Sequence, residues 1–207
     1  MKLLILGATG GTGRALLEQA RARDHDVTAF VRSPQKLGGL SEGITVLRGD
    51  PMNPAELRAA LPGHDAVLSA LGAPGPGRTT VLQGSGRATV QAMQAAGTRR
   101  LLIVSVAALF EDAGFIPALF RKTILRNIVK DAAAMERAVT SSDLDWTIAR
   151  PPRLTNGRLT RRYRVADGRL PRGRVWVSRA DVADFLLTEL EDRRHIHEIV
   201  GMAGGGD

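Results

Sequence analysis

The chain has 207 residues, 43% of them hydrophobic and 24% charged, a composition typical of one globular domain with a sizeable core. It contains no cysteine, which excludes disulfide frameworks, zinc–thiolate sites and thiol nucleophiles. Its formal net charge is +8, but no stretch is long and apolar enough to span a membrane, and the N-terminus enters a strand rather than a signal peptide. We therefore expect a cytoplasmic protein without a membrane partner.

Strand-like and helix-like segments alternate along most of the chain. The predicted strands are short, aliphatic or β-branched, and bounded by turn formers; they cover residues 3–6, 25–32, 44–48, 65–71, 100–104 and 145–149. Between them the sequence favours helices over residues 14–23, 54–60, 79–96 and 118–139. This alternation predicts an α/β fold, a doubly wound parallel sheet of Rossmann-like type in a single domain.

A small β insertion interrupts the alternation near the C-terminus. We expect residues 163–166 and 174–177 to form two short strands of a hairpin-like insertion around Asp167-Gly168. Ser178 is expected to cap a helix over residues 179–190. A last strand over 196–200 and a frayed tail over 201–207 follow.

The first strand ends in a turn with three glycines, Gly7, Gly10 and Gly13, spaced three residues apart. A glycine turn between a buried strand and a helix aims backbone N–H groups and the positive end of the helix at one point. Because a pyrophosphate binds well at such a point, we predict a dinucleotide cradle. Its expected binding residues are Gly7, Thr9, Gly10, Gly11, Thr12 and Gly13.

The residue at the end of the second predicted strand is Arg32, with Lys36 shortly after it. An acidic residue at this place would hold the ribose 2′-hydroxyl of NAD, whereas an arginine fork matches a 2′-phosphate. We therefore predict NADP(H) rather than NAD(H) as the cofactor. The alternative interpretation of Arg32 is an ordinary surface arginine at a strand end.

Further motifs occur at the ends of the other predicted strands and along the helices. They are GATGGTG, FVRSPQKL, RGD, DAVLSALG, TTVLQGSGRATVQAM, VSVAAL, MERAV, LDWTIARPP and SRADVADFLL. Together they cover nearly the whole chain, which resembles the atypical short-chain dehydrogenase/reductase-like NAD(P)H-binding family. Within that family it is most similar to the NADPH-dependent flavin reductases, the biliverdin reductase B group.

The resemblance implies a binding role for each motif. It implies that Asp50 and Pro51 line the adenine edge, and that Leu71 and Gly72 line the adenosine and ribose. The nicotinamide side would be formed by Ser105, Pro152, Arg153 and Leu154, the last three in a turn. All these positions follow strand ends, where an open α/β sheet leaves its ligand crevice. The expected organisation is an NAD(P)-binding domain over 1–200, with substrate-side elements at about 105–120 and 151–177.

Alcohol-oxidising short-chain dehydrogenases use a Tyr-x-x-x-Lys pair, in which the lysine lowers the pKa of the catalytic phenol. The only tyrosine here is Tyr163, and Asp167 stands where that lysine would be. We therefore predict an NADPH-dependent oxidoreductase whose hydride acceptor is flat and conjugated: a flavin, a linear tetrapyrrole or a quinone. Such an acceptor takes up charge in its own ring system.

Two residues are candidates for the catalytic centre. Ser105 is predicted to hydrogen-bond the nicotinamide carboxamide or the acceptor, the alternative being a hydroxyl that caps the strand end. Arg153 stands where the mammalian flavin reductase carries a histidine. Because an arginine stays charged, it is a poor general acid, but it can clamp an anionic group of the acceptor.

The charged residues leave other functions open. Eight arginines lie between residues 153 and 174, which suits a solvated basic face or a site for an anionic small molecule. Nucleic acid is a weaker alternative, because aromatic residues, on which bases could stack, amount to only 4%. The alternatives to a flavin reductase are a non-catalytic NADP-binding redox sensor of NmrA-like type and a reductase of quinones or small carbonyls. The family resemblance suggests a monomer, or at most a weak dimer.

Three remaining features are interpreted as structural. His195 and His197 are two residues apart, so a strand would place both on one face, but with no third ligand expected nearby we predict no metal site. Glu136 is expected on the solvated surface of its helix. The apolar loop 107–117 is expected either to cover the acceptor or to pack as a surface lid.

Overall fold

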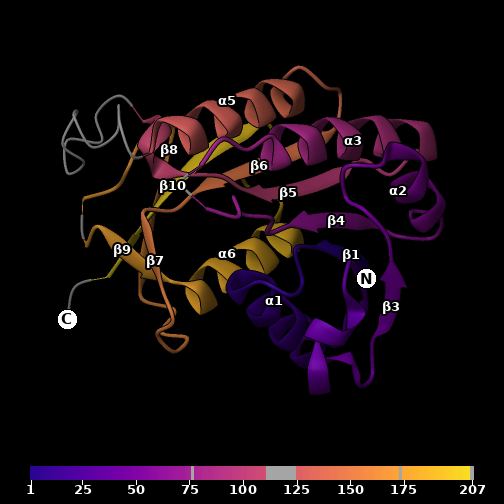
Figure 1. The fold of residues 1–207 in the computed structure, drawn as a ribbon. Coiled ribbons are helices and arrows are strands. Elements are labelled where there is room, and N and C mark those ends of the chain that lie inside the picture. The colour runs from indigo at the N-terminus through magenta and orange to yellow at the C-terminus, as the bar shows by residue number, and fades with distance from the viewer. Residues whose placement is uncertain (76, 111–124, 173, 206–207) are drawn as a thin grey trace.

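The computed structural model describes residues 1–75, 77–110, 125–172 and 174–205. Within these residues, eight strands form one sheet in the order β3-β2-β1-β4-β5-β6-β10-β8 (Figure 1). Neighbouring strands are parallel except β10 and β8, which are antiparallel. The strands of this sheet are β1 (Lys2–Leu6), β2 (Asp26–Val31), β3 (Thr45–Arg48), β4 (Ala66–Ser69), β5 (Arg100–Val104), β6 (Asp145–Arg150), β8 (Tyr163–Asp167) and β10 (Glu198–Gly204).

Helices cover both faces of the sheet, which confirms the predicted doubly wound α/β fold (Figure 1). The two layers share each strand: Leu3 and Ile5 of β1 pack with α1 and α6, whereas Leu4 and Leu6 pack with α2, α3 and α5. A strand buried on both faces needs apolar residues at every position, as β1 has. The helices are α1 (Gly11–Ala22), α2 (Pro54–Ala60), α3 (Val81–Ala96), α5 (Arg126–Thr140) and α6 (Arg179–Asp192).

Most predicted helices agree with the structure in position. The predicted cap of the last helix is confirmed, because Ser178 Oγ accepts a hydrogen bond from Asp181 N at 2.9 Å. The helix predicted over 118–139 corresponds to α5, and residues 118–124 lie outside the described residues. In the described part of the chain, no helix is both long and apolar enough to cross a membrane.

The predicted hairpin near the C-terminus is wrong. β8 pairs with β10, with Ala166 opposite Gly201, and not with β9 (Trp176–Ser178). β9 lies instead parallel to β7 (Arg153–Thr155) in a separate two-stranded sheet, so the predicted turn at Arg153 is a short strand. Pairing with β10 lets β8 join the large sheet, where its backbone groups find hydrogen-bond partners. The hydrogen bonds that β8 gains in the large sheet outweigh the local preference of Asp167-Gly168 for a hairpin turn.

The last strand is longer than predicted and includes residues 201–204, which the sequence predicts to be frayed. Residues 201–204 belong to β10 and, like Val200 before them, are largely buried between β6 and β8. A side chain at Gly201 would collide with the backbone carbonyl of Arg169, and a Cβ at Gly204 would lie 2.5 Å from Trp176 O. These glycines therefore allow close packing of backbones rather than chain freedom.

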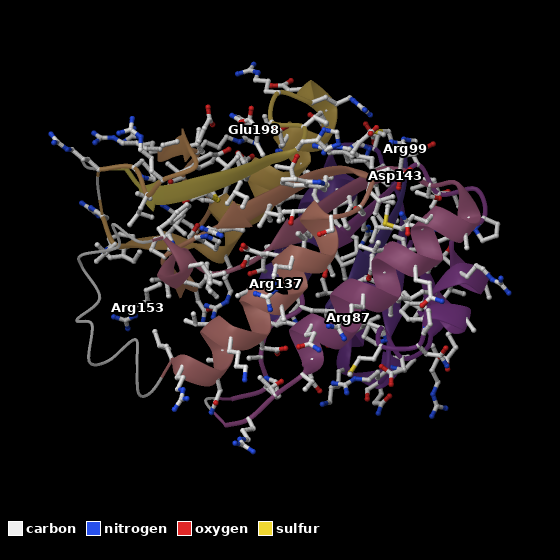
Figure 2. The ribbon with its side chains drawn as sticks, turned by 90° about the horizontal axis from the view of Figure 1, so that it is seen from above. Arg87, Arg99, Arg137, Asp143, Arg153 and Glu198 are labelled. Atoms are coloured by element: carbon white, nitrogen blue, oxygen red, sulfur yellow. The ribbon has the colours of Figure 1, made fainter. Side chains whose placement is uncertain are left out.

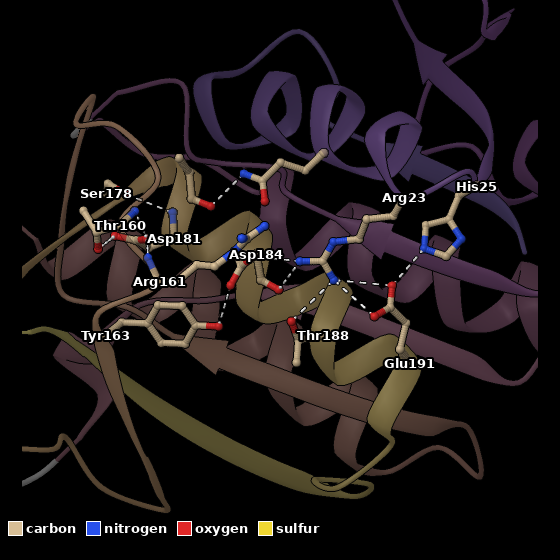
Figure 3. A network of polar contacts seen from close by, with 12 residues as sticks. Arg23, His25, Thr160, Arg161, Tyr163, Ser178, Asp181, Asp184, Thr188 and Glu191 are labelled. Carbon is tan, nitrogen blue, oxygen red and sulfur yellow. Dashed lines mark hydrogen bonds and ion pairs between the residues drawn. The ribbon is translucent and has the colours of Figure 1, made fainter.

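A network of polar contacts ties the insertion to α6 and α1 (Figure 3). Asp181, 3% exposed, accepts a hydrogen bond from the backbone N–H of Arg161 at 2.9 Å. Asp184, 4% exposed, accepts from Tyr163 Oη at 2.9 Å and forms ion pairs with Arg161 and Arg23. Because buried carboxylates are costly without partners, these contacts fix the position of the chain around residue 161.

Candidate cofactor and acceptor site

The glycine turn between β1 and α1 has the geometry of a ligand cradle. Gly7 has φ +78°, and a Cβ there would lie 2.7 Å from the backbone carbon of Ala70, after β4. A side chain at Gly13 would collide with the carbonyl oxygen of Gly7. Gly10 is the N-cap residue of α1 and supplies no side-chain cap, so the first N–H groups of the helix remain open to a ligand.

Arg14, which the sequence analysis missed, links this turn to the segment after β2. Its Nε donates to Thr9 O at 3.3 Å, and its Nη2 donates to Lys36 O at the end of the 3₁₀-helix η1 (Pro34–Lys36). Arg32 directly follows β2, and both Arg32 and Lys36 are exposed. Arg14 therefore fixes the backbone beside these two cations. The only sequence signal for Arg14 is its place directly after Gly13.

The predicted adenine-side residues lie at the same edge of the sheet. Asp50 and Pro51 follow β3, and Leu71 and Gly72 follow β4, so both pairs lie beyond carboxyl ends of parallel strands. The Asp50 carboxylate is exposed and accepts a hydrogen bond from Met52 N at 3.0 Å. This local turn fixes the direction of the chain as it leaves β3.

Ser105 and the segment after β6 are joined by backbone hydrogen bonds. Ser105 N donates to Ala149 O at 2.7 Å, and Ala107 N donates to Pro151 O at 3.0 Å. The Ser105 side chain is 5% exposed, and within the described residues its Oγ has no hydrogen-bond partner. A buried hydroxyl without a partner is costly, so the atom is suited to a ligand.

Arg153 and Leu154 lie in β7, after the buried Pro152. Arg153 N donates to Val175 O at 3.3 Å, which holds the backbone against the β9 segment. The Arg153 side chain is exposed and makes no ion pair with the residues that the structure describes. Figure 2 shows it on the outside of the molecule, apart from α3 and α5, where Arg87 and Arg137 lie.

The predicted surface position of Glu136 is wrong. Glu136 is 5% exposed, and its carboxylate receives two hydrogen bonds from Arg150, from Nε at 2.9 Å and from Nη2 at 2.5 Å. The Arg150 guanidinium also lies 4.6 Å from the centre of the buried Phe110 ring. These contacts hold the end of β6 against α5 and against the start of the loop 107–117. The two prolines follow directly after this strand end. Residues 111–117 of that loop lie outside the described residues.

The single tyrosine is not placed for acid catalysis. Burial and the neighbouring Asp184 carboxylate raise the pKa of the Tyr163 phenol well above its usual range. Its hydroxyl donates to Asp184 within the network of Figure 3. A catalytic tyrosine needs the opposite shift, so Tyr163 acts as a structural hydrogen-bond donor.

Basic residues border the open sides of the glycine turn. A cleft of about 400 Å³ is lined by Gly11, Arg14, Arg158 and Arg179, among others. The Arg179 side chain lies so close to Gly11 that a Cβ there would come within 2.5 Å of its Cδ, and its Nη1 donates to Asn156 at 2.7 Å. Arg179 therefore places positive charge beside the N-terminus of α1.

A second basic cleft, of about 740 Å³, lies between the N-terminal ends of α3 and α5. It is lined by Arg78, Thr79, Thr80, Gln83, Arg126, Asn127, Lys130 and Asp131. Asp131 is buried and accepts hydrogen bonds from Leu82 N and Gln83 N at 3.1 and 3.0 Å, so it caps α3. None of the predicted site residues lines this cleft.

The two C-terminal histidines differ from their predicted arrangement. They lie in the connection between α6 and β10 rather than on one strand, and His197 has φ +60°. His197 Nε2 contacts Leu144 O at 2.9 Å, which supports its structural role. His195, however, has Asp167 and Glu198 beside it, so the expectation that no third metal-binding group lies nearby is wrong.

The chain matches known proteins over most of its length. A model of an NAD(P)H-binding family matches residues 7–193, from the first glycine of the turn to the end of α6. The uncharacterized protein YwnB of Bacillus subtilis is 30% identical to the chain over 210 residues, which is 96% of each protein.

Solved structures share the whole fold. ChuY, an anaerobilin reductase of Escherichia coli O157:H7, has a TM-score of 0.83 at 23% identity, over 99% of this chain and 97% of ChuY. A short-chain dehydrogenase/reductase of Veillonella parvula, in complex with NADP, has a TM-score of 0.76 at 22% identity, over 99% of this chain and 95% of the other. Similarity at these identities is one of fold.

Proposed function

The chain belongs to the NAD(P)H-binding family, and we propose that it is a reductase that uses NADPH to reduce a flat conjugated acceptor. The observation that carries this proposal is a glycine cradle followed, directly after β2, by an exposed arginine instead of an acid. ChuY, which shares the fold, is named as a reductase, and the Veillonella structure contains NADP.

The residues present fit this cofactor. Gly7 and Gly13 keep the turn free of side chains, and the open N-terminus of α1 is suited to the pyrophosphate. Arg32 and Lys36 would hold the 2′-phosphate, with Arg14 fixing their backbone. Arg179 would add positive charge at the pyrophosphate. Asp50, Pro51, Leu71 and Gly72 would surround the adenosine.

Ser105 is the group that would orient the reacting ring. NADPH, when bound, supplies a hydride from C4 of its nicotinamide. The buried Oγ of Ser105 has no described protein partner, so it is available to the carboxamide or the acceptor. Because Tyr163 is held by Asp184, this chain provides no phenol for proton transfer. That favours acceptors whose conjugated system takes up charge, such as a flavin, a linear tetrapyrrole or a quinone.

Turnover with a panel of acceptors tests the proposal. NADPH oxidation is measured with FMN, riboflavin, biliverdin, a naphthoquinone and a small aldehyde, and without acceptor. We expect oxidation with at least one of the flat conjugated acceptors and none with the aldehyde. Tight NADPH binding without oxidation by any of them would overturn the proposal in favour of a nucleotide-binding redox sensor.

Arg32→Asp tests the cofactor preference. We expect this change to weaken NADPH binding by about a hundredfold, because a charge-assisted 2′-phosphate contact becomes a repulsion, while NADH binding changes little. Arg87→Asp, the same change on the exposed surface of α3, is the control and should leave both affinities unchanged. Equal losses for NADPH and NADH in Arg32→Asp would contradict the assignment.

Arg153→Ala tests whether the acceptor is anionic. We propose that Arg153 binds a phosphate or carboxylate of the acceptor, since its exposed guanidinium has no described ion-pair partner and it is the first of eight arginines between residues 153 and 174. The ratio of kcat/KM for FMN to that for riboflavin should fall about tenfold in this variant. Arg137→Ala, an exposed arginine of α5, is the control. An unchanged ratio in Arg153→Ala would show that the anion contact lies elsewhere.

A further inference from the structure

We propose that Asp167, His195 and Glu198 form a binding site for Zn²⁺ at the edge of the sheet opposite the cofactor residues. Glu198 is the first residue of β10, and Asp167 is the last residue of the antiparallel β8. His195 lies in the connection after α6, three residues before Glu198. Potential ligand atoms of the three side chains lie within 4.8 Å of one another. Figure 2 shows Glu198 beside the yellow ribbon of β10, above Arg137 of α5 in the view.

The imidazole of His195 is fixed in an orientation suited to metal binding. Its Nδ1 lies 2.7 Å from Glu189 Oε2, and its backbone N–H donates to Glu189 Oε1 at 2.7 Å. The backbone oxygen of His195 in turn accepts from Thr147 Oγ1 at 2.6 Å. A carboxylate that accepts the Nδ1 proton leaves Nε2 as the free ligand atom, the usual arrangement around a metal-bound histidine. That Nε2 lies 3.3 Å from Asp167 Oδ1.

Charge around the cluster also favours a divalent cation. Glu189 is 3% exposed and pairs with the buried Arg100, whose Nη2 lies 3.5 Å from Glu189 Oε1. Its charge is therefore balanced without the cluster. Asp167 and Glu198 bring two carboxylates to one point, and a divalent cation would neutralise their charge.

Glu198 supplies an independent observation. Its Oε2 atom is buried, and among the described residues it has no hydrogen-bond donor. A buried carboxylate oxygen without a donor is costly, because it loses its hydration without replacement. A cation between Glu198 and His195 would satisfy it.

The ligand set selects the metal. One imidazole nitrogen and two carboxylate oxygens suit Zn²⁺, which then completes a tetrahedron with one water. The ligands come from β8, β10 and the connection after α6, so the ion would join the C-terminal elements to each other. The site lies away from Ser105 and the glycine turn, so its role would be structural and independent of the proposed reductase activity.

Zinc titration of the metal-free protein tests the site, without NADPH or acceptor. The full chain is stripped with EDTA, dialysed, and titrated with Zn²⁺ by calorimetry; Co²⁺ absorption then reports tetrahedral coordination. We expect one equivalent of Zn²⁺ per chain and a rise in Tm on binding. His195→Gln and Glu198→Gln should each weaken binding at least about tenfold.

Two further variants keep the test decisive. Asp167 is two-thirds exposed, so Asp167→Asn should fold normally and still lose affinity. His25 Nε2 lies 3.2 Å from Glu191 Oε1 in a histidine–carboxylate pair outside the cluster, so His25→Gln should bind Zn²⁺ like the wild type. Absence of binding in the wild type, or binding that survives in Asp167→Asn and Glu198→Gln, would overturn the proposal.

Discussion

At the scale of single residues, Ser105 and Tyr163 carry hydroxyl groups in opposite situations. Tyr163 Oη is held by a buried carboxylate that also binds two arginines, whereas Ser105 Oγ is buried without a described partner. A hydroxyl that is satisfied by the protein contributes to stability. One that is left unsatisfied stabilises nothing in the free protein and is open to a ligand.

Removing each hydroxyl in turn distinguishes the stabilising role of Tyr163 from the proposed ligand-binding role of Ser105. Tyr163→Phe should lower the free energy of unfolding by about 1.5 kcal/mol, because Asp184 loses a donor, and leave the kcat of NADPH oxidation within about twofold. Ser105→Ala should show the reverse, with a stability equal to or above that of the wild type and a kcat lowered about tenfold. Urea unfolding and steady-state turnover measure both. A large loss of kcat in Tyr163→Phe would contradict the structural role of the phenol.

At the scale of elements, the glycine turn depends on β4 as much as on β1 and α1. Gly7 combines a positive φ with close contact to the backbone after β4, so two constraints act on one residue. Gly97, the C-cap of α3, has nearly the same φ, +77°, but no atom of the described residues lies within 4 Å of a Cβ placed there. Comparing the two glycines therefore separates the effect of a left-handed backbone from the effect of close packing.

Alanine at these two positions gives a matched pair. Gly97→Ala should cost about 1 kcal/mol, the strain of a left-handed residue alone. Gly7→Ala adds a clash with Ala70 and should cost about 3 kcal/mol in all, with weaker NADPH binding because the cradle shifts. Chemical unfolding and nucleotide titration check this. Equal losses of stability, or unchanged NADPH affinity in Gly7→Ala, would contradict it.

At the scale of the whole molecule, the sequence predicts the parallel core well and the C-terminal part poorly. The hydrophobic periods of strands and helices are local signals, and so is the glycine turn. These signals suffice to predict β1 to β6 and the edge of the sheet at which Gly7, Asp50 and Ser105 lie. The pairing of β8 with β10, the burial of Glu136 against Arg150 and the cluster around His195 depend on residues far apart in the chain. Local patterns do not encode such partners.

The place of β10 in the sheet also constrains the order in which the chain completes its fold. β10 is the last strand in sequence, yet it lies inside the sheet, between β6 and β8. During synthesis β8 emerges well before β10, its one neighbour in the large sheet among the described residues, so the backbone of β8 stays unpaired until residues 198–204 leave the ribosome. The C-terminal seven-residue strand therefore acts as the closing piece of the domain. A chain that ended before it would lose two strands from the sheet, not one.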